Sequence, residues 1–116
     1  MNNNELLQPT AALIVKSLHL DDNTFADVDA FEALRQRVRS VVENMLEHDP
    51  QRFINMLYIM DISEKKVAEV LRAPKQENDD VYLQLADVII ARELKKVETR
   101  LAYKEKFTAE EDGEKW

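Results

Sequence analysis

The sequence predicts an all-α fold, a compact bundle of about five helices with a long C-terminal helix. Apolar residues recur at helical spacing over long segments, and aspartate, serine or proline stands where several of those segments begin. The single glycine among the 116 residues is Gly113, near the end. Because tight hairpin turns favour glycine, a sheet is disfavoured.

The clearest helix is predicted after Asp29, which is expected to cap it, with Glu32 completing a capping box. One face of this helix is apolar over more than four turns, and it holds Phe31, Leu34, Val38, Val41, Val42 and Met45. Glu32/Arg35 and Arg39/Glu43 have the spacing of ion pairs on one helix. The helix is expected to end near His48.

Two further helices are predicted on either side of this one. Residues 10–20 follow Pro9 and are interpreted as a helix, with a short buried strand as the alternative. Asp49 and Pro50 have the chemistry of a helix start. Residues 53–60 are apolar nearly all round, which predicts the central and most buried helix of the bundle.

The remaining helices are predicted from their caps. Ser63 is expected to cap a short helix over 64–72, and a polar loop with Pro74 follows over 73–78. Asp79 or Asp80 is expected to cap the last helix, whose stripe contains Leu83, Ala86, Ile90, Leu94, Val97 and Leu101. We expect one domain over residues 1–107 and an acidic, frayed tail over 108–116.

Composition excludes several classes of function. Without cysteine the chain has no disulfides, thiolate metal sites or thiol nucleophiles, and without glycine-rich loops it lacks nucleotide-binding fingerprints. The N-terminus has no basic secretory start, and the apolar run over 11–15 is too short to span a bilayer, so we expect an unanchored cytoplasmic protein. The net charge of −7 disfavours binding to membranes and nucleic acids.

Residues 21–32 resemble an EF-hand calcium loop in part. Oxygen-bearing side chains occupy the first, third, ninth and twelfth positions counted from Asp21. Phe25 stands at the fifth position, where a ligand belongs, and Ala26 at the sixth, where glycine allows the sharp turn. The favoured interpretation is an acidic connection between helices, with a degenerate calcium loop as the alternative.

Residues 50–72 could form a helix-turn-helix in which 64–72 is the recognition helix. Lys65, Lys66 and Arg72 could contact DNA phosphates or bases. Glu64 and Glu69 lie on the same helix, and the whole chain is acidic. Simple helix packing is therefore favoured, and regulatory DNA binding is kept as an alternative.

Few residues of this chain are suited to catalysis, so we expect a non-enzymatic protein without a cofactor or metal. His19 and His48 are the only histidines, and neither belongs to a recognisable motif. Glu43 and Glu47 lie on one helix face and are interpreted as surface charge rather than as an acid–base pair.

The last helix carries the features that favour an interaction role. Basic residues recur every four positions as a ridge, which consists of Arg92, Lys96, Arg100 and Lys104. Such a ridge could hold an acidic partner, including residues 21–32 of another subunit, or a phosphate-bearing ligand, although a solvated face is the favoured interpretation. The apolar stripe also continues to Leu101, Tyr103 and Phe107, beyond the expected partners within the chain, which predicts a homo-oligomer or a protein partner.

Residues 31–106 resemble small bacterial all-helical proteins of unassigned function. The segments that carry this resemblance are Leu46-Glu47-His48-Asp49, Leu57-Tyr58, Asp61-Ile62-Ser63-Glu64-Lys65-Lys66-Val67 and Ile89-Ile90-Ala91-Arg92-Glu93-Leu94. The resemblance implies a helical domain from a bacterium, and it assigns no catalytic or binding residue.

Overall fold

A computed structural model describes residues 4–72 and 79–113, with side chains described over 5–72 and 79–104. This part of the chain forms five helices and no strand: α1 Asn4–Ser17, α2 Phe31–His48, α3 Pro50–Ile59, α4 Glu64–Arg72 and α5 Val81–Gly113. The predicted all-α fold with a long C-terminal helix is confirmed.

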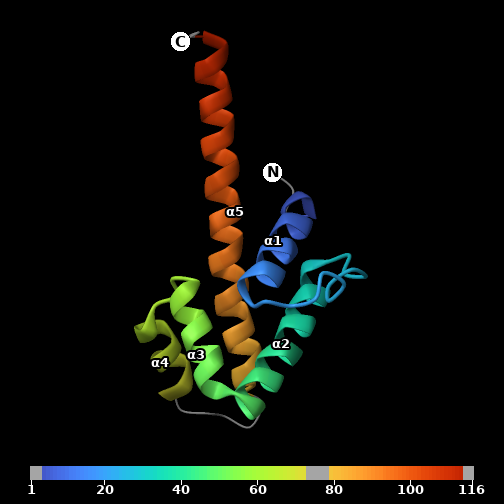
Figure 1. Cartoon of the computed structure of the whole chain (residues 1–116), viewed down its shortest axis with the longest axis vertical. Coiled ribbons are helices and arrows are strands. Elements are labelled where there is room, and N and C mark those ends of the chain that lie inside the picture. Colours follow the sequence, from blue (N-terminus) through green and yellow to red (C-terminus); the bar gives the residue numbers. More distant parts are fainter. Residues whose placement is uncertain (1–3, 73–78, 114–116) are drawn as a thin grey trace.

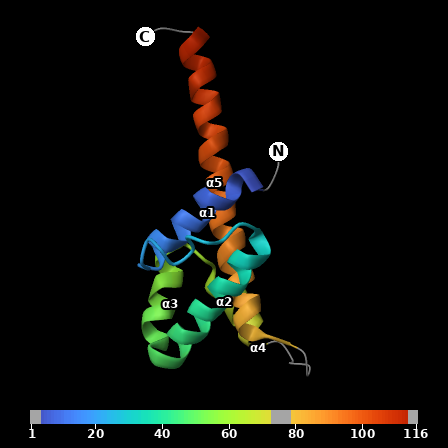
Figure 2. The same cartoon turned by 90° about the vertical axis from the view of Figure 1, so that its right-hand side faces the viewer.

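Helix α5 is the helix against which most of the other helices pack. Helices α1, α2 and α4 pack against it, and α3 packs against α2 (Figure 1). Figure 2 shows α1 crossing α5 partway along its length. The bundle surrounds only the first part of α5, and the end of this helix projects alone (Figure 1).

The core lies where these helices meet. Its least exposed large side chains come from four of the helices and from the turn after α1, and they include Ile14, Leu18, Leu34, Val38, Val42, Phe53, Leu85 and Ile89. Phe25 and Val28 add to this core from the connection between α1 and α2. The acidic connection is therefore anchored to the core by its two apolar side chains.

Helix α2 has the predicted face and ion pairs but not the predicted cap. Arg35 lies 3.5 Å from Glu32, and Arg39 lies 2.6 Å from Glu43. The N-cap residue is Ala30, which makes no side-chain cap hydrogen bond, so the predicted cap at Asp29 and its capping box are wrong. Burial of Val28 in the core fixes the direction in which the chain enters α2, and it leaves Asp29 exposed.

The other three predicted caps are confirmed. The backbone N–H of Arg52 donates to Asp49 over 3.2 Å, and that of Lys66 donates to Ser63 over 3.4 Å. Of the two aspartates proposed for α5, Asp80 is the cap, since it accepts the Leu83 N–H over 3.1 Å.

Helix α1 begins at Asn4, earlier than predicted, and Pro9 lies inside it. A proline within a helix costs about 3 kcal/mol because it removes a hydrogen bond and crowds the preceding turn. Leu6 and Leu7 precede it and are both 3% exposed. Their burial stabilises the first turn by about 1.5–3 kcal/mol each, which is enough to offset the proline.

Helices α1 and α3 both end in a left-handed residue that is not glycine. His19 has φ 55° and Asp61 has φ 62°. In each case the next N–H reaches back five residues, from Leu20 to the Val15 carbonyl over 2.9 Å and from Ile62 to the Leu57 carbonyl over 3.0 Å. These are Schellman ends, so the scarcity of glycine did not exclude left-handed turns.

Two expectations about the later helices differ from the structure. Helix α3 is not the most buried helix, because Tyr58 is 52% exposed and Ile59 is 75% exposed. Residues 108–113, expected to be a frayed tail, are the end of α5. No proline or glycine interrupts the sequence from Val81 to Asp112, so nothing in it breaks the helix earlier.

Candidate interaction surfaces

The C-terminal arm, which we define as residues 102–113 of α5, extends beyond the bundle (Figure 1). Val97 is 6% exposed, and Leu101 is half-buried and lines a hollow with Pro9 and Leu13 of α1. After Leu101 the described side chains are exposed, and Tyr103 is 69% exposed. The arm thus begins at the point beyond which α1 no longer packs against α5.

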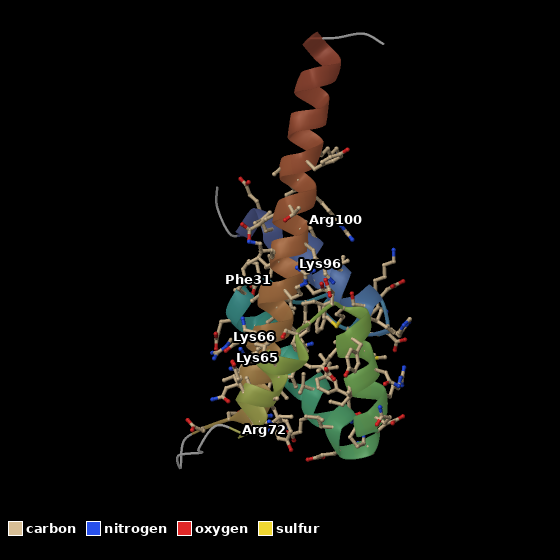
Figure 3. All side chains as sticks on the ribbon, turned by 90° about the vertical axis from the view of Figure 1, so that its left-hand side faces the viewer. Phe31, Lys65, Lys66, Arg72, Lys96 and Arg100 are labelled. Atoms are coloured by element: carbon tan, nitrogen blue, oxygen red, sulfur yellow. The ribbon has the colours of Figure 1, made fainter. Side chains whose placement is uncertain are left out.

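The basic ridge divides into two parts. Arg92 lies 3.1 Å from Asp61, and Lys96 lies 2.8 Å from Glu93, so this half is engaged within the chain. Arg100 and Lys104 are exposed, and neither makes an ion pair with a described side chain. Figure 3 shows Lys96 and Arg100 on α5, above the basic side chains of α4. Only the half of the ridge near the arm is available to a partner.

The pair of Glu93 and Lys96 belongs to a polar contact between α1 and α5 that the sequence did not reveal. Glu93 is fully buried, and Ser17 donates to its Oε1 over 2.5 Å. The Lys96 ammonium lies close to Oε2, off the line of a hydrogen bond. Because the Glu93 carboxylate has no access to solvent, it cannot contact a substrate. It instead connects α1 to α5 through the hydrogen bond that Ser17 donates.

An apolar groove separates α3 from α4, and we call it the α3–α4 groove. Its volume is about 500 Å³. Its apolar lining comprises Ile54, Leu57, Tyr58, Ile62, Val67, Ala68 and Leu71, and its charged rim comprises Glu64, Lys65 and Arg72. Tyr58 and Leu71 are 52% and 47% exposed, which leaves an open apolar surface.

Sequence reasoning missed this groove because it assigned residues 53–60 to the centre of the bundle. One signal was present in the length of α4, which has only nine residues. Val67, Val70 and Leu71 are its larger apolar residues, and so short a helix cannot cover the whole apolar surface of α3.

The proposed recognition helix has the expected placement. Helices α3 and α4 are separated by four residues, and Ser63 caps α4. Lys65, Lys66 and Arg72 are exposed on α4 (Figure 3), and none of them makes an ion pair with a described side chain. Lys65 and Arg72 line the groove between α3 and α4, whereas Lys66 lines a separate hollow between α4 and α5, so the three cations of the helix-turn-helix hypothesis do not share one face.

Residues 21–32 pack two apolar side chains against the bundle. Phe25 and Val28 are buried, and Asp27 lies 2.5 Å from Arg37 on α2. The Asp21 carbonyl accepts the Thr24 hydroxyl over 2.6 Å. Within the described ranges, no three histidine or acidic side chains gather closely enough to hold a metal ion.

The titratable residues considered for catalysis are dispersed. His19 is exposed at the end of α1, and His48 Nδ1 lies 2.8 Å from the Asn44 carbonyl. Glu43 pairs with Arg39 rather than with Glu47.

Across residues 4–72 and 79–113, no helix is long and apolar enough to cross a membrane.

No protein family, curated protein or solved structure matches this chain. The resemblance to small bacterial helical proteins stays a prediction.

Proposed function

We propose that this chain is a non-enzymatic protein-interaction module that associates with a second copy of itself through the C-terminal half of α5. The observation that carries the proposal is the projection of the arm. Helix α5 has 33 residues. At 1.5 Å per residue its length is about 50 Å, and the bundle covers it only up to Leu101.

The uncovered arm gains no stability from packing of its described side chains against the bundle beyond Leu101. Isolated helices shorter than about 12–15 residues are marginal in water, because most helical stability in proteins comes from packing. The arm has 12 residues, and Tyr103 exposes most of its surface there. A second copy that packed on the arm would bury this tyrosine and stabilise the helix to its end.

Charge also favours a protein partner. Arg100 and Lys104 lie at the base of the arm without an ion pair among the described side chains, on a chain with a net charge of −7. Exposed carboxylates such as Asp21, Asp22 and Asp29 are available to them on a second copy of the same protein. Opposite charges across an interface steer association and fix its register.

Sedimentation equilibrium of the full chain over a range of concentrations tests this proposal. We expect a reversible dimer, and we expect Tyr103→Glu to weaken dimerisation by at least about tenfold, since a buried interface carboxylate without a partner costs more than about 1.4 kcal/mol. Asn44→Glu adds the same charge to an exposed position of α2 and is the matched control. A chain that stays monomeric up to about 1 mM, where even weak specific complexes form, would contradict the proposal.

A second candidate function, sequence-specific DNA binding, is favoured by the three exposed cations of α4. A mobility-shift assay at low salt would show a complex that dissociates as salt is added, because phosphate contacts release counterions. Lys65→Ala and Lys66→Ala should each weaken such a complex. Absence of any shift at low salt would leave self-association as the sole candidate.

A further inference from the structure

We propose that the α3–α4 groove of one copy receives the C-terminal arm of the second copy. This inference rests on the proposed self-association and names the surface that the arm contacts. The groove has the size of a site for a few side chains, at about 500 Å³. Its floor is apolar, and the exposed Tyr58 and Leu71 flank it.

The positions of the groove and the arm suit a reciprocal contact. The start of α4 lies beside residues 88–95 of α5, since Ile62 and Ser63 share a hollow with Val88 and Lys95. The groove is thus level with the first half of α5, whereas the arm is its far end (Figure 1). Two copies with antiparallel α5 helices would bring each arm to the groove of the other, as two-fold symmetry requires.

In the antiparallel dimer, the order of charges along the groove complements the order of charges along the arm. Figure 3 shows Lys65 and Arg72 in descending order along α4, so that α4 runs opposite to α5 of its own copy. The arm of an antiparallel partner therefore runs parallel to α4. Its base, with Lys104, would meet Glu64 at the start of α4.

The tip of the arm completes the match. Glu110, Glu111 and Asp112 follow one another in the sequence there. In the parallel orientation the end of the arm lies toward the end of α4, where Arg72 is the last residue. Arg72 is exposed and makes no ion pair with a described side chain, and its charge is opposite to that of this acidic run.

Cross-linking between two cysteine variants tests the contact directly, because the natural chain has no cysteine. Leu71→Cys places a thiol at the groove, and Ala109→Cys places one in the arm. We expect a mixture of these two full-length variants to give a cross-linked heterodimer with a short bis-maleimide. The matched control pairs Ala109→Cys with Asp22→Cys, which lies at an exposed position between α1 and α2 and should give little product.

A charge exchange tests the proposed register. Arg72→Glu should weaken dimerisation by about tenfold or more, which is typical when one partner of an interfacial charge pair is reversed. Adding Glu110→Lys and Glu111→Lys to Arg72→Glu should restore most of the affinity. Arg52→Glu makes the same change at an exposed α3 position outside the groove and should leave dimerisation within about twofold.

The outcomes separate this inference from the proposed function. If the chain is a dimer by sedimentation but the mixed cross-link is absent and Arg72→Glu behaves as Arg52→Glu does, the groove is not the receptor and self-association stands. Cross-links between two Leu71→Cys chains alone would indicate a groove-to-groove dimer and would also overturn the inference. A strict monomer overturns both.

Discussion

His19 and Asp61 hold the left-handed backbone at the ends of α1 and α3. A residue with a Cβ atom costs about 1–2 kcal/mol there, and glycine avoids this cost at an entropic penalty of about 0.5–1 kcal/mol. We therefore expect His19→Gly to raise the free energy of unfolding by about 0.5–1 kcal/mol. His19 is the better position to change, because Asp61 also pairs with Arg92.

His48→Gly is the matched control for this prediction. His48 is the last residue of α2 and lies within the helix, so glycine should lower the free energy of unfolding there by about 0.5–1 kcal/mol. Urea unfolding followed by circular dichroism, with an unchanged m value, measures both effects. A loss of stability in both variants would show that the left-handed residue imposes no net cost at His19.

Single residues were predictable where their partners are close in the sequence. Asp49, Ser63 and Asp80 cap helices because each faces an N–H three residues ahead, and the spacing alone indicates this. Glu93 was not predictable, because its burial depends on Ser17, 76 positions away. The failed cap at Asp29 has the same cause, since core packing of the preceding valine decided the entry to α2.

At the level of whole helices, the apolar pattern predicted faces well and burial poorly. The stripe of α2 is buried as expected, and the ion pairs on its other side are present. The pattern of α3 was interpreted as full burial, yet Ile59 is 75% exposed. Periodicity indicates which side of a helix is apolar, whereas the extent to which that side is buried depends on the lengths and positions of the neighbouring helices.

Asp80 connects the start of α5 to α2, and this gives a prediction about pH. It caps α5 through the Leu83 N–H and lies 2.6 Å from Arg39, whose hydrogen bond lowers the pKa of the aspartate. Asp80→Asn should lower the free energy of unfolding by about 0.5 kcal/mol at neutral pH, through the lost charge at the helix N-terminus, because asparagine caps a helix about as well as aspartate. The half-buried ion pair with Arg39 adds little to this, because solvent still reaches and screens it.

The sign of the pH dependence follows from the lowered pKa. The contribution of the ionised Asp80 is complete above the unfolded pKa, at about 3.9, and is lost as the pH falls through the lower pKa of the folded state. The difference between the natural chain and Asp80→Asn should therefore be constant from pH 7 to about pH 5 and should shrink below about pH 4. Asp22→Asn, at an exposed position without an ion pair in the described residues, is the control. An undiminished difference at the acid end would contradict this account.

For the molecule as a whole, the projecting arm was predictable from the sequence and the α3–α4 groove was not. An apolar stripe that outlasts its partners is visible in the sequence, and the projecting end of α5 agrees with it. The α3–α4 groove depends on how two short helices diverge over residues 50–72, which no local pattern encodes. The projection also affects the dimensions, since the radius of gyration is 16.4 Å, above the roughly 13 Å of a compact domain of this length.

The dimensions of the dimer provide a test of its arrangement. One copy measures 57 × 32 × 25 Å, and its longest axis follows α5 (Figure 1). If each arm lies in the groove of the other copy, the two α5 helices overlap side by side, and the longest dimension stays near the 57 Å of one copy. Contact through the tips of the arms alone would come close to doubling this length. Small-angle X-ray scattering of the dimer distinguishes the two arrangements, and a nearly doubled maximum dimension would exclude arms that lie in the grooves.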